Sequence, residues 1–146
     1  SLLPKHRGAA PIVRAIAAGE QVPGVTLQHM AREVDAGDVI AQEAMEIGAN
    51  ETAGDLSARM SVVAARVLLE QLPARESGTA KRVPQDHAAA TFAKPLRKEE
   101  GHIDFARTAK SVHDHVRAMT PWPGAYADLD AGGPAIRIVL KATEPI

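Results

Sequence analysis

Residues 24–47, which read GVTLQHMAREVDAGDVIAQEAMEI, decide the fold class of this chain. From Gly24 to Met30 successive side chains fall into two alternating sets, the period-two pattern that is typical of a β-strand. The stretch Asp35-Ala-Gly-Asp38 interrupts this alternation, and a second strand is expected from about Val39 to Ile47. Because an acidic turn separates the two predicted strands, we expect them to form a hairpin-like pair.

Helices are predicted on both sides of this pair. Residues 8–18 favour a helix because Pro11 stands near the first turn, where its missing amide costs nothing, and Gly19 ends it. Thr52 and Asp55 have capping-box spacing and open the longest predicted helix, which Pro73 is expected to close. Three- and four-residue steps predict its apolar face, which comprises Leu56, Met60, Val63 and Val67, widened by Ala64, Leu68 and Leu72.

The C-terminal part of the chain has a different pattern. Residues 74–90 mix glycine, proline and charged residues without periodicity, and we interpret them as a linker. Beyond them a helix is expected from about Thr108 to Met119, followed by a Pro-Trp-Pro-Gly turn. Two further strands are expected at Tyr126–Asp128 and Ala135–Lys141, which makes this region rich in β-structure.

The composition limits the classes of function. Hydrophobic residues make up 45% and charged residues 24%, as in ordinary soluble globular proteins, and the net charge of -1 favours no partner. The absence of cysteine excludes disulfides and thiolate metal sites, and it fits the cytoplasm or, in a eukaryote, an organellar matrix. Because no apolar run approaches the ~20 residues of a membrane span, we expect no membrane association. His113 and His115, two apart on a predicted helix, point to different sides, so we expect no metal site.

Several motifs in register give this chain a family resemblance. Ser1-Leu-Leu-Pro4, Gly24-Val-Thr26 and Asp35-Ala-Gly-Asp38 together resemble the folate-dependent formyltransferases, and Arg7-Gly-Ala-Ala-Pro-Ile12 resembles the methionyl-tRNA branch of that family. The segments 98–105 and 117–126 are similar to the start of the family's C-terminal domain. The resemblance implies an α/β fold: the C-terminal half of a Rossmann-like catalytic domain (1–73), a linker (74–90) and the beginning of an OB-like β-barrel that contacts tRNA (91–146).

The resemblance also implies a site. In the family, an Asn-x-His-x segment before Ser-Leu-Leu-Pro supplies an asparagine and a histidine, and an aspartate at the position of Asp35 completes the catalytic group. We therefore expect an internal piece of such an enzyme, inactive alone, with Asp35 as its catalytic residue. The alternative is an ordinary turn aspartate that bonds its own backbone. The donor would be 10-formyltetrahydrofolate, bound by Ser1, Leu2, Leu3, Pro4, Val34 and Gly37.

The partner implied by the resemblance is methionyl initiator tRNA, and the α-amino group of its methionyl residue would receive the formyl group. The enzyme is expected to be a monomer. Basic residues suited to phosphate contact are Lys94, Arg97, Lys98, Arg107 and Lys110, although any solvated face carries such charges. Two alternatives stay open. One is a formyltransferase of the same superfamily that acts on an amino sugar nucleotide, and the other is a folate- or tRNA-binding module without chemistry.

Overall fold

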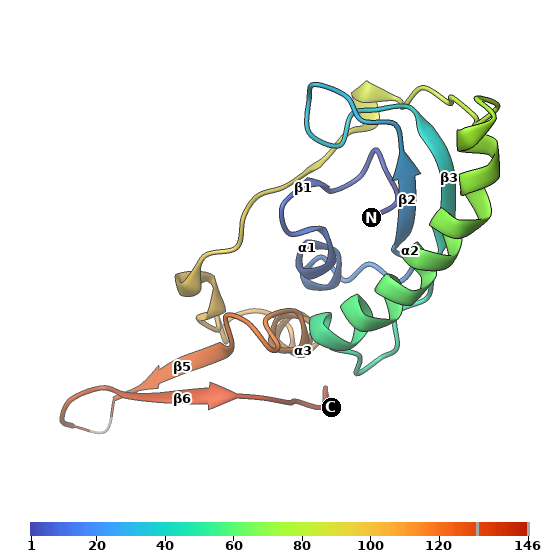
Figure 1. The fold of residues 1–146 in the computed structure, drawn as a ribbon. Coiled ribbons are helices and arrows are strands. Elements are labelled where there is room, and N and C mark those ends of the chain that lie inside the picture. The colour runs from blue at the N-terminus through green and yellow to red at the C-terminus, as the bar shows by residue number, and fades with distance from the viewer. Residues whose placement is uncertain (131, 146) are drawn as a thin grey trace.

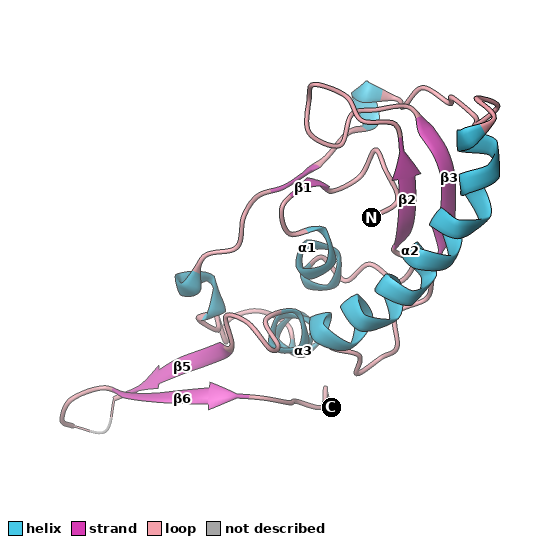
Figure 2. Cartoon of the chain, in the orientation of Figure 1, coloured by secondary structure: helices cyan, strands magenta, loops and turns pink. Residues whose placement is uncertain are grey.

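The computed structural model describes residues 1–130 and 132–145. These residues form three two-stranded sheets and three α-helices, and the C-terminal hairpin projects from the rest of the molecule (Figures 1 and 2). The elements in chain order are β1 (Arg7–Gly8), α1 (Pro11–Ala17), β2 (Gly24–Gln28), β3 (Val39–Ala44), α2 (Ala53–Glu76), η1 (His87–Ala89), β4 (Phe92–Ala93), η2 (Lys98–Gly101), α3 (Ala109–Ala118), β5 (Ala125–Leu129) and β6 (Ile136–Leu140).

The predicted strand pair is confirmed as the antiparallel sheet β2–β3, in which Gly24 pairs with Ala44 and Leu27 with Ala41. Both strands are shorter than predicted. The register shifts between Leu27 and Gln28, and the last residue of the alternating pattern, Met30, is 95% exposed. The chain therefore leaves the sheet early and forms a long loop between the two strands.

The start of α2 was predicted correctly, but its end was not. Thr52 Oγ1 accepts a hydrogen bond from the Asp55 amide at 3.2 Å, and Asp55 Oδ2 accepts one from the Thr52 amide at 3.2 Å. The prediction that Pro73 closes the helix is wrong, because α2 continues to Glu76. Proline removes one donor from the helix, and the carbonyl that loses it belongs to the solvent-exposed Leu69, where water can take its place.

The apolar face of α2 is narrower than predicted. Leu56 is fully buried, and Met60 and Val67 are 6% and 4% exposed. Leu68 and Leu72, which were expected to widen the stripe, are 46% and 38% exposed. Leu68 and Leu72 each follow a more buried residue, Val67 and Gln71, and therefore lie on a side of the helix that faces solvent.

Two buried clusters share α3. The first brings together residues of all three helices and of the β3–α2 connection, namely Ile16, Ile47, Ala53, Leu56, Met60 and Ala118. The second lies on the other side of α3 and comprises Ile103, Val116, Met119 and Ala125. The predicted helix 108–119 thus joins the first part of the chain to the β5–β6 hairpin.

A buried ionic cluster strengthens this junction. Asp114, whose side chain is 6% exposed, accepts bonds from Lys110 Nζ at 2.6 Å and Arg117 Nη2 at 2.8 Å, and Arg117 Nη1 donates to the Glu51 carbonyl at 3.2 Å. Burial alone raises the pKa of the Asp114 carboxyl, but the bonds from Lys110 and Arg117 outweigh it and leave the pKa below its usual value. The charged pair therefore belongs to the core.

The second half of the chain contains the β5–β6 antiparallel pair at the two predicted strand positions. Apolar residues on this hairpin are exposed, including Leu129, Ile136, Ile138 and Val139. No helix within residues 1–130 and 132–145 has the length and apolar character of a membrane span.

Candidate active site

Asp35 lies in the loop between β2 and β3 in a left-handed conformation, with φ of 53°. Aspartate tolerates this region better than most residues with a Cβ. Two residues later the loop passes so close to its own start that a Cβ on Gly37 would lie 1.8 Å from the carbonyl oxygen of His29. Glycine is therefore required at position 37 for the loop to keep its shape.

The Asp35 carboxylate is held by two other elements. Its Oδ2 accepts a hydrogen bond from the Gly8 amide of β1 at 2.8 Å, and its Oδ1 accepts one from Gln28 Nε2 of β2 at 3.0 Å. Gln28 Oε1 in turn accepts a bond from the Gly37 amide at 3.1 Å. The sequence alone left two interpretations of Asp35 open, a catalytic residue or a turn residue that bonds its own backbone. In the structure its side chain connects β1 to β2.

The approach of Gly8 to Asp35 depends on a parallel pairing between β1 and β4. Gly8 has φ of 122°, and a Cβ there would lie 2.7 Å from the Ala93 carbonyl oxygen. A side chain at position 8 would therefore push β1 away from β4 and move the amide that holds Asp35.

Sequence reasoning missed two buried polar residues beside this loop. Arg7 and Gln85 are 4% and 7% exposed, and Gln85 Oε1 accepts bonds from Arg7 Nε at 3.2 Å and Nη2 at 2.7 Å. Gln85 Nε2 donates to the carbonyl oxygens of Asp35 at 3.0 Å and Gly37 at 2.6 Å. A lone glutamine in an aperiodic segment gives no pattern that could have identified it.

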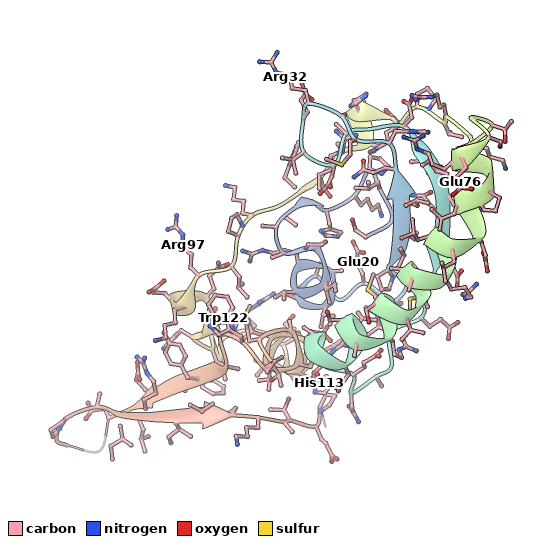
Figure 3. The ribbon with its side chains drawn as sticks, in the orientation of Figure 1. Glu20, Arg32, Glu76, Arg97, His113 and Trp122 are labelled. Carbon is pink, nitrogen blue, oxygen red and sulfur yellow. The ribbon has the colours of Figure 1, made fainter. Side chains whose placement is uncertain are left out.

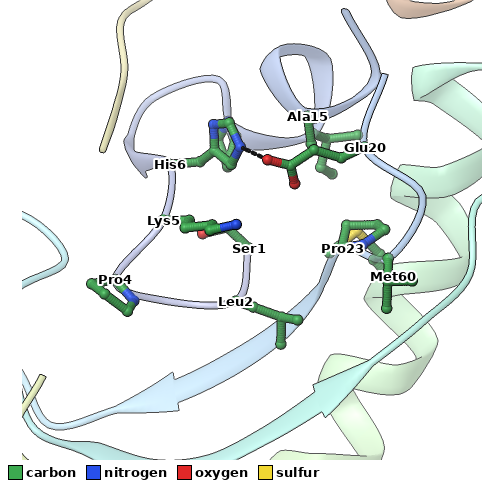
Figure 4. A pocket seen from close by; sticks show the side chains of 12 residues that line it. Ser1, Leu2, Pro4, Lys5, His6, Ala15, Glu20, Pro23 and Met60 are labelled. Atoms are coloured by element: carbon green, nitrogen blue, oxygen red, sulfur yellow. Dashed lines mark hydrogen bonds and ion pairs between the residues drawn. The ribbon is translucent and has the colours of Figure 1, made fainter. Parts of the chain in front are cut away.

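The predicted folate-binding residues fall into two groups. Ser1 to Pro4 lie against β2, where Thr26 Oγ1 accepts from the Leu3 amide at 3.1 Å and donates to the Ser1 carbonyl at 2.8 Å. Ser1, Leu2 and Pro4 line a pocket that is closed on one side by the His6–Glu20 contact of 2.7 Å (Figure 4). Leu3 is buried, while Val34 and Gly37 belong to the Asp35 loop.

An open pocket lies beside Asp35. It is lined by the Asp35 loop, by β1 and by the strand β4 with the residues after it, namely Arg7, Gly8, Ala9, Val34, Asp35, Phe92, Ala93, Lys94 and Pro95. Phe92 is 72% exposed, so its ring is available at the edge of this pocket. Lys94, one of the predicted phosphate-binding residues, therefore lies at the candidate site.

The other predicted basic residues are distributed differently. Arg97 and Lys98 are exposed at the start of η2, and the Arg97 side chain points away from the body of the molecule (Figure 3). Arg107 is exposed in the turn before α3, whereas Lys110 is bonded to Asp114. The part of the chain that the structure describes contains no group of three or more His, Asp or Glu side chains placed to hold a metal ion.

Comparison with known proteins assigns this chain to a family. Residues 1–72 match the family model described as formyl transferase, and residues 95–145 match the one described as formyl transferase, C-terminal domain. The chain belongs to the formyltransferase family, and its fold is the α/β formyltransferase fold.

Individual relatives agree with this assignment. The chain is 46% identical over 130 residues to a protein named methionyl-tRNA formyltransferase from Macrococcus caseolyticus, an alignment that covers 89% of this chain and 42% of that protein. This chain spans less than half the length of the curated relatives that it matches.

Solved structures show the same fold. A 4-N formyltransferase from Francisella tularensis superposes with a TM-score of 0.80 at 24% identity, covering 98% of this chain and 60% of that one. An N-formyltransferase from Helicobacter canadensis, solved with folinic acid and dTDP-3-aminofucose, gives 0.75 at 24% identity and covers 80% and 44%.

Proposed function

We propose that this chain forms part of an enzyme that transfers a formyl group from 10-formyltetrahydrofolate to the α-amino group of methionyl-tRNA. The amine nitrogen attacks the formyl carbon, the bond from that carbon to N10 of the folate breaks, and a proton passes from the amine to N10. The products are formylmethionyl-tRNA and tetrahydrofolate. Such a transfer needs a group that manages the proton and donors that stabilise the developing oxyanion.

The observation that carries this proposal is the fixed carboxylate of Asp35. Gly8 and Gln28 each donate to one carboxylate oxygen, so the group is oriented before substrates bind. Each oxygen still has a lone pair, and the side chain borders the open pocket. Asp35 would orient the histidine that the family resemblance implies and hold a water for proton transfer.

The folate is proposed to contact Ser1, Leu2, Leu3 and Pro4 on one side and the backbone around Val34 and Gly37 on the other. The hydrogen bonds of Thr26 to Ser1 and Leu3 support this assignment, because they fix the first segment against β2. The Helicobacter canadensis enzyme with this fold was solved with folinic acid, which is itself a folate.

The acceptor is proposed to enter through the pocket beside Asp35 and to extend over residues 91–146, the beginning of an OB-like tRNA-binding barrel that follows a linker at 74–90. Exposed Phe92 and Lys94 at the pocket suit a nucleotide's base and phosphate. The name of the Macrococcus caseolyticus relative supports tRNA as the acceptor. We expect the complete enzyme to act as a monomer in the cytoplasm.

The decisive experiment measures formyl transfer by the complete enzyme to methionyl-tRNA and, in parallel, to amino-sugar nucleotides. Turnover of methionyl-tRNA is expected, whereas turnover of the sugar nucleotide alone would replace the proposal with its superfamily alternative. The 146-residue chain by itself should bind without turnover. Binding of folate and tRNA by the complete enzyme without any transfer would favour the non-catalytic module.

Asp35→Asn keeps the size of the side chain and removes its charge, so it tests the assigned role. We expect the turnover of the complete enzyme to fall by at least ~100-fold, as for loss of general-base support. Asp38→Asn in the same loop is the matched control, because Asp38 faces Arg82 at 3.6 Å and should change turnover little. Near wild-type turnover of Asp35→Asn would remove Asp35 from the mechanism.

The basic residues can be separated by their surroundings. Neutralising Arg97 or Lys98, which are exposed, should weaken tRNA binding and reduce the salt dependence of the binding constant by about one charge each. Neutralising Lys110 should instead lower stability, because its ammonium group pairs with buried Asp114. Salt titrations of tRNA binding, together with unfolding curves, measure both effects.

A further inference from the structure

Gln85 lies between α2 and β4, in a segment whose other side chains are mostly exposed, yet only 7% of Gln85 is accessible. We propose that Gln85 is a positioning residue. It fixes the backbone of the loop between β2 and β3 and thereby sets the direction of the Asp35 carboxylate. The inference rests on the proposed function, since it assigns Gln85 to the same site. Gln85 reaches Asp35 across 50 residues of sequence.

The partners of Gln85 determine which way its amide faces. Arg7 offers only donors, so the oxygen of Gln85 must face it, and this oxygen receives bonds from Arg7 Nε and Nη2. The carbonyls of Asp35 and Gly37 offer only acceptors, so the nitrogen must face them. A side chain that both accepts twice and donates twice is needed here, and glutamine provides it.

These bonds act on the part of the loop that controls the direction of the carboxylate. Gln85 binds the carbonyls of Asp35 and Gly37, so one side chain holds both the peptide plane that joins Asp35 to Ala36 and the one that joins Gly37 to Asp38. Asp35 itself has a positive φ, a conformation that residues with a Cβ leave readily unless their surroundings fix it. Fixing the backbone also fixes the Cα–Cβ direction, and therefore where the carboxylate points.

The contacts form a closed ring. Asp35 accepts through its carboxylate from the Gly8 amide, Gly8 follows Arg7 in β1, Arg7 donates to Gln85, and Gln85 donates to the Asp35 carbonyl. Arg7, which is 4% exposed, also contacts His87 Nδ1 through Nη1 at 3.3 Å. This ring of contacts includes both the main chain and the side chain of Asp35. Loss of the Gln85 hydrogen bonds therefore leaves both less firmly held.

Gln85→Glu is the informative variant. Glutamate keeps the oxygen that accepts both bonds from Arg7 and the volume of the side chain, but it has no N–H group for the Asp35 and Gly37 carbonyls. In the complete enzyme we expect turnover to fall by roughly 10- to 100-fold, with the KM for either substrate changed less than about 3-fold. Gln21→Glu is the matched control, because the side chain of Gln21 is exposed and bonds only to the nearby Gly19 carbonyl. Turnover of Gln85→Glu within about 2-fold of wild type overturns the inference.

A double-mutant cycle separates positioning from a general structural role. If Gln85 acts through Asp35, adding Gln85→Glu to Asp35→Asn should lower turnover by less than about 3-fold further. If the two losses multiply in full, Gln85 does not act through Asp35 and the inference is wrong.

Amide hydrogen exchange of residues 34–38 gives a readout that needs no turnover. Gln85→Glu should accelerate exchange in this loop by about 10-fold or more while α2 keeps its protection. Unchanged exchange in the loop overturns the inference. If the wild-type enzyme forms no formylmethionyl-tRNA, the proposed function fails, and the exchange experiment still decides whether Gln85 fixes the loop.

Discussion

Replacing Gly37 with alanine tests how closely the function depends on the shape of the Asp35 loop. The new Cβ would lie 1.8 Å from the His29 carbonyl oxygen, whereas ordinary contact begins near 3.4 Å. The segment around Gly37 must therefore move away from His29 by about 1.5 Å. A displacement of ~1 Å in a catalytic group costs about 100-fold in rate. We expect kcat/KM for methionyl-tRNA to fall by at least ~100-fold and the unfolding free energy by about 1–3 kcal/mol.

The assay is initial-rate formylation by the complete enzyme at varied tRNA and folate concentrations, with urea unfolding of the same samples. Gly133→Ala is the matched control, because a Cβ there meets no atom within 4 Å, and it should change neither quantity measurably. If Gly37→Ala keeps kcat/KM within about 3-fold of wild type, the close approach of the loop to His29 does not set the position of Asp35.

Three further predictions concern stability and are measured by urea unfolding. Thr52→Ala removes the side-chain half of the α2 capping box and should cost about 1 kcal/mol. Leu56→Ala, at a fully buried position, should cost about 2–5 kcal/mol, whereas Leu69→Ala, which is 65% exposed, should cost under about 0.5 kcal/mol. The folded pKa of Asp114 lies below its unfolded value of 3.8, so its contribution is present above that pH and is lost as the pH falls through and below it. Asp114→Asn should therefore destabilise by about 3 kcal/mol near neutral pH and make stability less sensitive to pH below about 4; an unchanged acid profile would contradict this.

Local patterns predicted most of the secondary structure. The alternation before Met30 and the Thr52–Asp55 spacing each depend on residues that are close in sequence. The pattern failed where the outcome depends on distant packing. Leu68 and Leu72 lie one residue beyond buried Val67 and half-buried Gln71, about 100° further round the helix, and that side of α2 faces solvent. Pro73 is tolerated because the carbonyl that loses its donor belongs to solvent-exposed Leu69.

The candidate site was less accessible to sequence reasoning than the fold. Asp35 was recognised because it stands in register with a family motif, and its contacts with Gly8 and Gln28 come from the geometry alone. Gln85 was missed because its partner Arg7 lies 78 residues away and no periodicity connects them. The segment interpreted as a linker therefore also contributes a buried residue beside Asp35.

The pairing of β1 with β4 has a consequence for the order of events during synthesis. Arg7 pairs with Phe92, and Asp35 receives its backbone bond from Gln85, so the loop stays incomplete until both later residues have been made. At 5–20 residues per second, the ribosome needs roughly 3–10 s to advance from position 35 to position 85. During that interval the nascent chain carries the proposed catalytic aspartate without its backbone bond from Gln85, although Gly8 and Gln28 have already been made.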